Sequence, residues 1–118
     1  MRPKERIMYI ECRSDNYTGP ASIGLVKYSK TGKSVHYKGK TFETLDGSSH
    51  NANYFDIDTG DPYWISGCCK DGRDAKFTMK VNIDADIREG YWTEIRKLPQ
   101  KKTQASFIAT GKITNRMS

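Results

Sequence analysis

Long apolar runs are missing from this chain of 118 residues. No stretch approaches the roughly 20 consecutive apolar residues that a membrane-spanning helix needs. The chain begins with the basic residues MRPKER, but no apolar segment of signal-peptide length follows them. We therefore expect a cytoplasmic protein that does not bind membranes.

Cysteine is scarce, with three residues at Cys12, Cys68 and Cys69. An odd number that includes an adjacent pair does not resemble the disulfide framework of a small secreted domain, which favours a reducing cytosol. Together with His36 and His50, the cysteines could supply zinc ligands. Structural zinc sites, however, separate their paired ligands by about two to four residues, which an adjacent pair does not do. The sequence therefore predicts no zinc site.

A complete nucleotide-binding motif is also absent. Gly32-Lys33-Ser34 resembles the end of a phosphate-binding loop, but the leading glycine of that motif would fall at position 27, which is Lys27. The phosphate-binding loop joins a strand to a helix, whereas this segment lies between two predicted strands. We interpret it as a hairpin turn in which Gly32 adopts a positive φ angle.

No set of residues for calcium binding or catalysis is complete. Asp56, Asp58 and Asp61 could supply oxygens to Ca²⁺, but their spacing departs from the EF-hand loop and no helix follows. A catalytic thiol at Cys69 would need a nearby base, and no histidine is close to it in sequence. We therefore expect no metal and no cofactor. The sequence does not decide whether the protein is an enzyme, and we favour a non-catalytic one.

Negative charge is missing from the C-terminal end. From position 97 onward five basic residues occur without an acid, whereas residues 1–96 hold the other fifteen Lys and Arg and all fourteen acids. The formal charge of +6 therefore belongs to the end of the chain, and the rest nets +1. Such a basic segment predicts weak nucleic-acid binding without sequence preference. The residues concerned are Lys97, Lys101, Lys102, Lys112 and Arg116.

The chain does contain a succession of short β-forming segments separated by turn residues, as is typical of a single small β domain. Alternating apolar residues and turn signals predict strands at 6–12, 22–29, 34–38, 40–45, 54–57, 63–67 and 77–83. The polar segment 46–53 (DGSSHNAN) is expected to be the longest internal loop. The prediction is a mainly β fold, a small antiparallel barrel or curved sheet of about six to seven strands.

The hydrophobic period changes after residue 83. Asp84 is a suitable N-cap, and apolar residues then recur at helical spacing up to Pro99. Gly90 argues against a long unbroken helix. We expect one C-terminal helix packed on the sheet, followed by a basic, disordered tail over 99–118. The predicted apolar stripe is Ile87, Tyr91, Ile95 and Leu98.

Aromatic and acidic residues gather in segment 53–74, where Asp58-Thr59-Gly60-Asp61 predicts a hairpin turn. One face of this hairpin is expected to join the core. The other could leave Tyr54 and Trp64 partly exposed as a stacking platform for a peptide, sugar or base, unless the helix or segment 46–53 covers them. The predicted contact residues are Tyr54, Asp56, Asp58, Tyr63 and Trp64.

Several segments together resemble a family of short, uncharacterised bacterial proteins. They are MYIE at 8–11, IGLVKYSKTGKS at 23–34, YKGKTF at 37–42, YFDIDTGDPYWISGCCKDGRD at 54–74 and EGYWTEI at 89–95. The resemblance implies no activity and no site residue. Some members carry the label 1-deoxy-D-xylulose-5-phosphate synthase, which we regard as an error, because nothing here resembles the cofactor-binding parts of that much larger thiamine-diphosphate enzyme. Similar chains start near Met8, so residues 1–7 are expected to be an N-terminal extension.

Residues 8–98 are thus expected to form one β-rich domain. We favour a small, non-catalytic binding module that contacts a protein or a small ligand through the aromatic and acidic hairpin. Weak non-specific nucleic-acid binding through the basic C-terminal residues is the alternative. Neither the partner nor the oligomeric state follows from the sequence.

Overall fold

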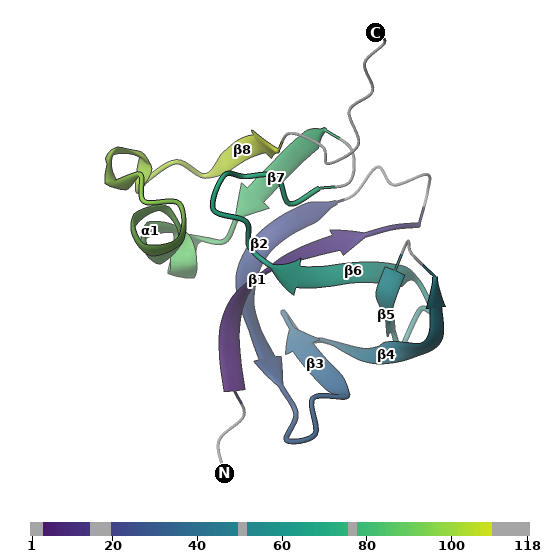
Figure 1. Ribbon diagram of the computed structural model, residues 1–118. Coiled ribbons are helices and arrows are strands. Elements are labelled where there is room, and N and C mark those ends of the chain that lie inside the picture. The colour runs from purple at the N-terminus through teal and green to yellow at the C-terminus, as the bar shows by residue number, and fades with distance from the viewer. Residues whose placement is uncertain (1–3, 15–19, 50–51, 76–77, 110–118) are drawn as a thin grey trace, which may run out of the picture.

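Six strands close into a barrel in the computed structural model, which describes residues 4–14, 20–49, 52–75 and 78–109 (Figure 1). Around the ring the order is β1-β6-β5-β4-β3-β2, and a pairing between β1 and β2 closes it. All neighbours in the ring are antiparallel. This confirms the predicted barrel. The strands are β1 Lys4–Cys12, β2 Ala21–Tyr28, β3 Ser34–Tyr37, β4 Lys40–Ser49, β5 Ala52–Asp56 and β6 Pro62–Gly67.

Two further strands extend the sheet beyond the barrel (Figure 1). β7 (Met79–Ile83) pairs in parallel with the first half of β2, while the second half of β2 pairs with β3. β8 (Ser106–Ala109) is antiparallel to β7. Residues 99–109, expected to belong to a disordered tail, instead contain a short 3-10 helix, η4 (Pro99–Lys101), and β8. The strand was missed because it is four residues long and depends on β7 for its hydrogen bonds.

Two other expectations about the chain need correction. Residues 4–7 are not an extension, because β1 begins at Lys4 and pairs with β2 as far as Tyr28. Segment 46–53 is mostly not a loop, because β4 continues to Ser49 and β5 begins at Ala52. The β4–β5 pairing has an irregular register between Thr44 and Ser49. Bulges of this kind are common at the rims of barrels and leave no alternation of apolar residues in the sequence.

The strands enclose one hydrophobic core and support a second. Side chains alternate between the two faces of a strand, so β1 and β2 contribute to both cores. The inner core fills the barrel and consists of the buried residues Met8, Ile10, Val26, Val35, Phe42 and Ile65. The outer core lies against the outside of the barrel and includes Tyr9, Ile23, Val81, Ile83, Tyr91 and Trp92.

A helix of three short segments covers the outer core (Figure 1). It runs through the 3-10 turn η2 (Ala85–Ile87), the α-helical turn α1 (Arg88–Gly90) and the π-helical η3 (Tyr91–Ile95). The predicted apolar stripe packs on the outer core as expected. Lys97, with a φ angle of 58°, lies just beyond the end of η3. Among the described residues, no helix has both the length and the apolar character to cross a membrane.

A hydrogen bond crosses β2 at Gly24. The Tyr37 hydroxyl donates to one oxygen of Asp84 at 2.6 Å, and Lys38 Nζ donates to the other oxygen at 3.0 Å. Asp84 occupies the predicted N-cap position, but its carboxylate makes no capping hydrogen bond. The Tyr37 ring and the Asp84 carboxylate lie so close to Gly24 that a Cβ there would overlap both. Glycine at this position therefore lets the start of the helix be tied to the end of β3.

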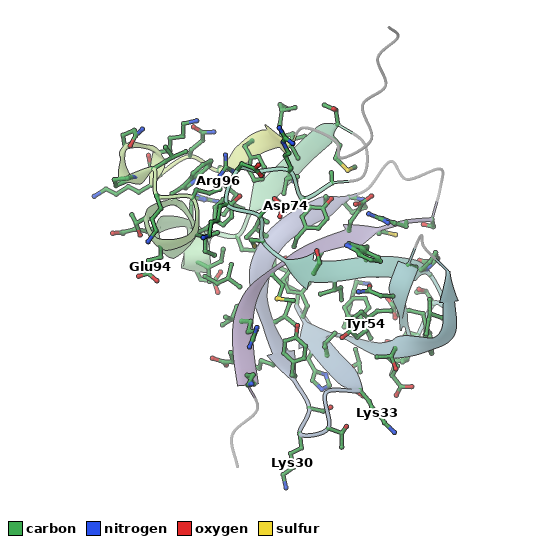
Figure 2. All side chains as sticks on the ribbon, in the orientation of Figure 1. Lys30, Lys33, Tyr54, Asp74, Glu94 and Arg96 are labelled. Carbon is green, nitrogen blue, oxygen red and sulfur yellow. The ribbon has the colours of Figure 1, made fainter. Side chains whose placement is uncertain are left out.

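Arg96 is built into the outer core beside the loop that carries Asp74 (Figure 2). Its guanidinium carbon lies 4.9 Å from the ring centroid of Phe107 and 5.0 Å from that of Trp92. Nη1 donates to the Tyr91 hydroxyl at 2.9 Å. This cation therefore holds the end of the helix against β8.

Candidate functional site

Two cations stand at one end of the inner core. Lys4 and Arg6 share a face of β1 with Met8 and Ile10, which are buried inside the barrel. Tyr28, at the end of β2, is directly opposite Lys4 in the β1–β2 register. This face of β1 therefore changes from apolar to basic where the barrel opens.

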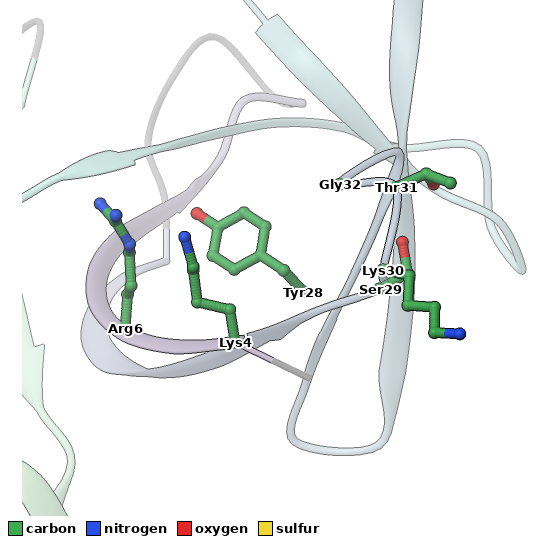
Figure 3. Close-up of a pocket in the computed structure, with 7 residues that line it drawn as sticks. All are labelled: Lys4, Arg6, Tyr28, Ser29, Lys30, Thr31 and Gly32. Carbon is green, nitrogen blue, oxygen red and sulfur yellow. The ribbon is translucent and has the colours of Figure 1, made fainter. Parts of the chain in front are cut away.

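A cavity of about 340 Å³ lies at this opening (Figure 3). We call it the basic cavity, and its lining residues are Lys4, Arg6, Tyr28, Ser29, Lys30, Thr31 and Gly32. The Tyr28 hydroxyl is directed toward the side of the cavity that holds Lys4 and Arg6, whereas the Lys30 ammonium points away (Figure 3). Among the described residues that line it, none is acidic. The cavity thus gathers hydrogen-bond donors around one space.

The charges of Lys4 and Arg6 are not neutralised locally. Within the described parts of the chain, neither side chain lies within ion-pair distance of a carboxylate. The intervening Glu5 faces the outside of the barrel and pairs with Lys27 at 3.7 Å. Unpaired cations around a partly enclosed space produce a local positive potential that attracts anions.

Tyr28 supplies a neutral donor beside these cations. Burial raises the pKa of its hydroxyl, the neighbouring Tyr54 raises it further, and Arg6 acts in the opposite direction. The net shift is upward, so the hydroxyl keeps its proton at neutral pH. Tyr28 can therefore donate a hydrogen bond to an anion without adding negative charge to the cavity.

The far wall of the cavity is the β2–β3 turn, whose shape is fixed by hydrogen bonds. Gly32 N donates to the Ser29 carbonyl at 3.0 Å, and Ser34 N donates to Ser29 Oγ at 3.2 Å. Gly32 has a φ of 78°, as expected for a hairpin turn. Gly32-Lys33-Ser34 thus joins two strands, which confirms the interpretation of this segment as a hairpin turn.

The opposite end of the barrel holds a smaller cavity of about 150 Å³. Its two lysines both have partners, because Lys38 pairs with Asp84 at 3.0 Å and Lys40 with Asp56 at 3.4 Å. The electrostatic attraction for an external anion is correspondingly weaker at this end. The lining residues are Ile10, Pro20, Ser22, Tyr37, Lys38, Lys40, Phe42 and Tyr63.

The aromatic residues predicted as contacts lie on two different faces of the hairpin. Tyr54 in β5 and Tyr63 in β6 are opposite each other, and both side chains pack against the inner core. Trp64 packs on the outer core, where the Arg13 guanidinium carbon lies 4.9 Å from its ring centroid. Tyr54 and Trp64 therefore do not form one stacking platform.

The predicted acidic residues shape the hairpin turn. Asp56 is buried and accepts hydrogen bonds from Asp58 N at 2.9 Å and Lys40 Nζ at 3.4 Å. The bond from the Asp58 backbone, followed by the Lys40 contact, lowers the pKa of Asp56. The Asp58 side chain is exposed. These contacts give Asp56 a structural role.

The basic C-terminal residues lie on another part of the molecule, at the end of the helix and in η4 (Figure 1). Lys97 and Lys102 are exposed, and Lys101 Nζ is 5.5 Å from the ring centroid of Trp92. Lys112 and Arg116 lie outside the described residues. The described lysines are thus available to solvent, but they are not part of the basic cavity.

Metal-ligating residues do not come together in residues 4–14, 20–49, 52–75 and 78–109, where no group of three His, Cys, Asp or Glu could hold an ion. The three cysteines are free thiols. Burial raises the pKa of Cys68, and the nearby Asp74 adds to this shift.

Comparisons with known proteins add no functional information. No protein-family model matches the chain, and neither a curated protein nor a solved structure is significantly similar to it. The functional proposal therefore rests on the geometry of the chain itself. Sequence reasoning missed Lys4, Arg6 and Tyr28. The series Lys4, Arg6, Met8, Ile10 along one strand face would have indicated the two cations, but nothing in it indicates Tyr28.

Proposed function

We propose that this protein is a non-catalytic binding module that holds a small anionic ligand in the basic cavity. The observation that carries the proposal is the convergence of Lys4, Arg6 and Tyr28 on a space whose described lining contains no acid. A volume of about 340 Å³ is at the lower end of the range for small-molecule sites. The barrel supplies a rigid frame, and the ligand supplies the missing negative charge.

Each of the three residues has a distinct part in binding. Arg6 offers a planar fork of N–H donors that suits two oxygens of one anion. Lys4 acts as a compact positive charge, and Tyr28 donates one hydroxyl hydrogen bond. Tyr54, from the predicted contact hairpin, packs against the inner core and interacts electrostatically with Tyr28, but it does not line the basic cavity.

The lining supports binding rather than catalysis. Ser29 and Thr31 are its hydroxyl residues besides Tyr28, and no histidine or carboxylate accompanies them among the described lining residues. A serine or threonine nucleophile needs an adjacent base. His36 contacts Thr41 Oγ1 at 3.1 Å, and it is exposed and not part of the lining.

Binding of sulfate and inorganic phosphate tests the proposal. This binding is measured by chemical-shift titration of the ¹⁵N-labelled full chain at constant ionic strength. We expect shifts to concentrate at residues 4–6 and 28–32, and Arg6→Gln to weaken binding at least tenfold, or about 1.4 kcal/mol. The matched control is Lys27→Gln, since Lys27 is at the same end of the barrel but is exposed on its outer face and paired with Glu5. Equal losses in both variants, or no binding to the parent chain, would refute the proposal.

Weak nucleic-acid binding by the basic C-terminal residues is a second candidate. It is favoured by the exposure of Lys97 and Lys102 in a segment that contains no acid. Removing the segment would also remove β8, so the better test replaces Lys97, Lys101 and Lys102 by Gln. Fluorescence anisotropy on oligonucleotides at low and near-physiological salt should show weaker, less salt-dependent binding by the triple variant. Unchanged binding would eliminate these lysines.

We also infer a cytoplasmic location, which the three free thiols support. Fractionation of cells that produce the tagged protein tests this, and recovery outside the cytoplasm would contradict it. We likewise propose that the chain belongs to the family of short bacterial proteins that its motifs resemble. A structure of one such protein without the parallel β2–β7 pairing would argue against that membership.

A further inference from the structure

We propose that the ligand of the basic cavity is an organic phosphomonoester, whose terminal phosphate binds Lys4, Arg6 and Tyr28 and whose organic part lies along the β2–β3 turn. This inference rests on the proposed anion site and specifies its ligand. It follows from the charge, the donor geometry and the volume of the cavity.

The charge of the cavity matches a dianion. Lys4 and Arg6 contribute two positive charges at the point of convergence, and no described carboxylate pairs with either of them. The Lys30 ammonium points away from this point (Figure 3). A phosphomonoester carries about −1.5 to −2 at pH 7, whereas a carboxylate or a sulfate ester carries a single negative charge. The phosphomonoester therefore neutralises both cations.

The donors also match a phosphate better than a carboxylate. Lys4 and Arg6 come from β1 and Tyr28 from β2, so the donors approach from two strands (Figure 3). A phosphomonoester presents three terminal oxygens to such donors. A carboxylate has two oxygens in one plane, which the Arg6 fork alone can occupy.

The volume indicates that the phosphate carries an organic group. A space of about 340 Å³ would hold about eleven waters at roughly 30 Å³ each, far more than one phosphate needs. The turn residues Ser29, Thr31 and Gly32 line the same cavity as the Tyr28 ring (Figure 3). The ring offers an apolar surface and the Ser29 hydroxyl offers a hydrogen bond, so this part of the cavity suits a small organic group.

Phenyl phosphate and phenyl sulfate form a matched pair of probes, because they differ in charge and share the organic group. At pH 7, isothermal titration of the full chain should give at least tenfold tighter binding of phenyl phosphate than of phenyl sulfate. Inorganic phosphate should bind more weakly than phenyl phosphate, because it leaves the turn side empty. Tyr28→Phe should weaken phenyl phosphate binding severalfold, and the control Tyr63→Phe, which does not line this cavity, should not.

The affinity for phenyl phosphate should also rise about tenfold from pH 5 to pH 7, because a phosphomonoester takes its second charge near pH 6. Among the described residues, the titratable and charged groups that line the site are Lys4, Arg6, Tyr28 and Lys30, with Tyr54 acting on Tyr28, and none of these is a histidine or a carboxylate, the types that titrate in this range. Phenyl sulfate should show no such change.

The outcomes separate the two proposals. If phenyl sulfate binds as tightly as phenyl phosphate and Arg6→Gln still abolishes binding, the phosphomonoester assignment is wrong but the anion site stands. Tighter binding of inorganic phosphate than of phenyl phosphate would also overturn the assignment, in favour of the free ion. If no probe binds, both proposals fail.

Discussion

Replacing Gly24 by alanine tests the account of how the helix is attached to the barrel. The new Cβ would overlap the Tyr37 ring and the Asp84 carboxylate, which are joined by a hydrogen bond of 2.6 Å. Neither side chain can turn away freely, because Tyr37 packs against the inner core and Asp84 is also bound by Lys38. The substitution must therefore break this hydrogen bond or displace β2.

The magnitude follows from these two possibilities. Overpacking of a well-packed site typically costs about 1–3 kcal/mol, and a hydrogen bond to a charged group contributes about 1.5–3 kcal/mol. Since relief of the overlap incurs one cost or the other, we expect Gly24→Ala to lower the free energy of unfolding by roughly 1–3 kcal/mol. Domains of this kind have a total of about 5–15 kcal/mol, so the loss is a large share of it.

Urea unfolding followed by tryptophan fluorescence measures this loss. For a slope of about 1–3 kcal/mol per molar urea, the midpoint should fall by about 1 M. Gly67→Ala is the matched control, because Gly67 also lies in a strand and a Cβ there meets nothing within 4 Å. Its free energy of unfolding should stay within about 0.5 kcal/mol of that of the parent chain. Equal midpoints for the two variants would show that the crossing at Gly24 is not a tight contact.

Three further substitutions or measurements address other contacts. Because the pKa of Asp56 is held below its usual value of 3.8, ionised Asp56 stabilises the fold above that pH, and the contribution is lost as pH falls through the lowered pKa. Asp56→Asn should therefore be less stable than the parent in urea at pH 7, and the difference should shrink below about pH 4; a difference that does not change with pH would contradict this. Arg96→Lys should lose about 1–2 kcal/mol in the same assay, since lysine lacks the planar guanidinium that stacks on the rings, whereas exposed Arg73→Lys should be neutral; equal effects would argue against the stacking. Burial raises the pKa of Cys68, so iodoacetamide at pH 8 should alkylate this thiol at least tenfold more slowly in the native chain than in urea. Peptide mass spectrometry measures the two rates, and equal rates would show that the thiol is not protected.

Much of the barrel could be predicted because its signals are local. The turns at Gly32 and Gly60 have the expected positive φ angles, and the stripe from Ile87 to Leu98 packs as its spacing indicates. The pairing of β8 with β7, in contrast, has no local signal in the sequence. It depends on a neighbour more than twenty residues away, and its inward residues Phe107 and Ala109 are too few to form a recognisable pattern.

The candidate site was harder to predict, because it depends on barrel closure. The register that sets Lys4 opposite Tyr28 joins two strands at the ring's seam, and the sequence does not specify that register. The placement of Tyr54 and Trp64 on one platform failed for a related reason, because it depends on the β5–β6 register. Tyr54 pairs with Tyr63, so Tyr54 packs on the inner core and Trp64 on the outer core, and residues that are close in sequence lie on opposite faces.

The pairing of β1 with β6, which are far apart in the sequence, affects the order of folding. The β2–β3, β3–β4 and β5–β6 hairpins each need only a short loop, whereas pairing Cys12 with Tyr63 closes a loop of about fifty residues. The chain entropy lost in that step exceeds that of a four-residue turn by roughly 2 kcal/mol. We therefore expect the hairpins to form first and β1 to join β6 late, whereas the basic cavity, which is lined by β1, β2 and the β2–β3 turn, depends on the β1–β2 pairing and not on this late step.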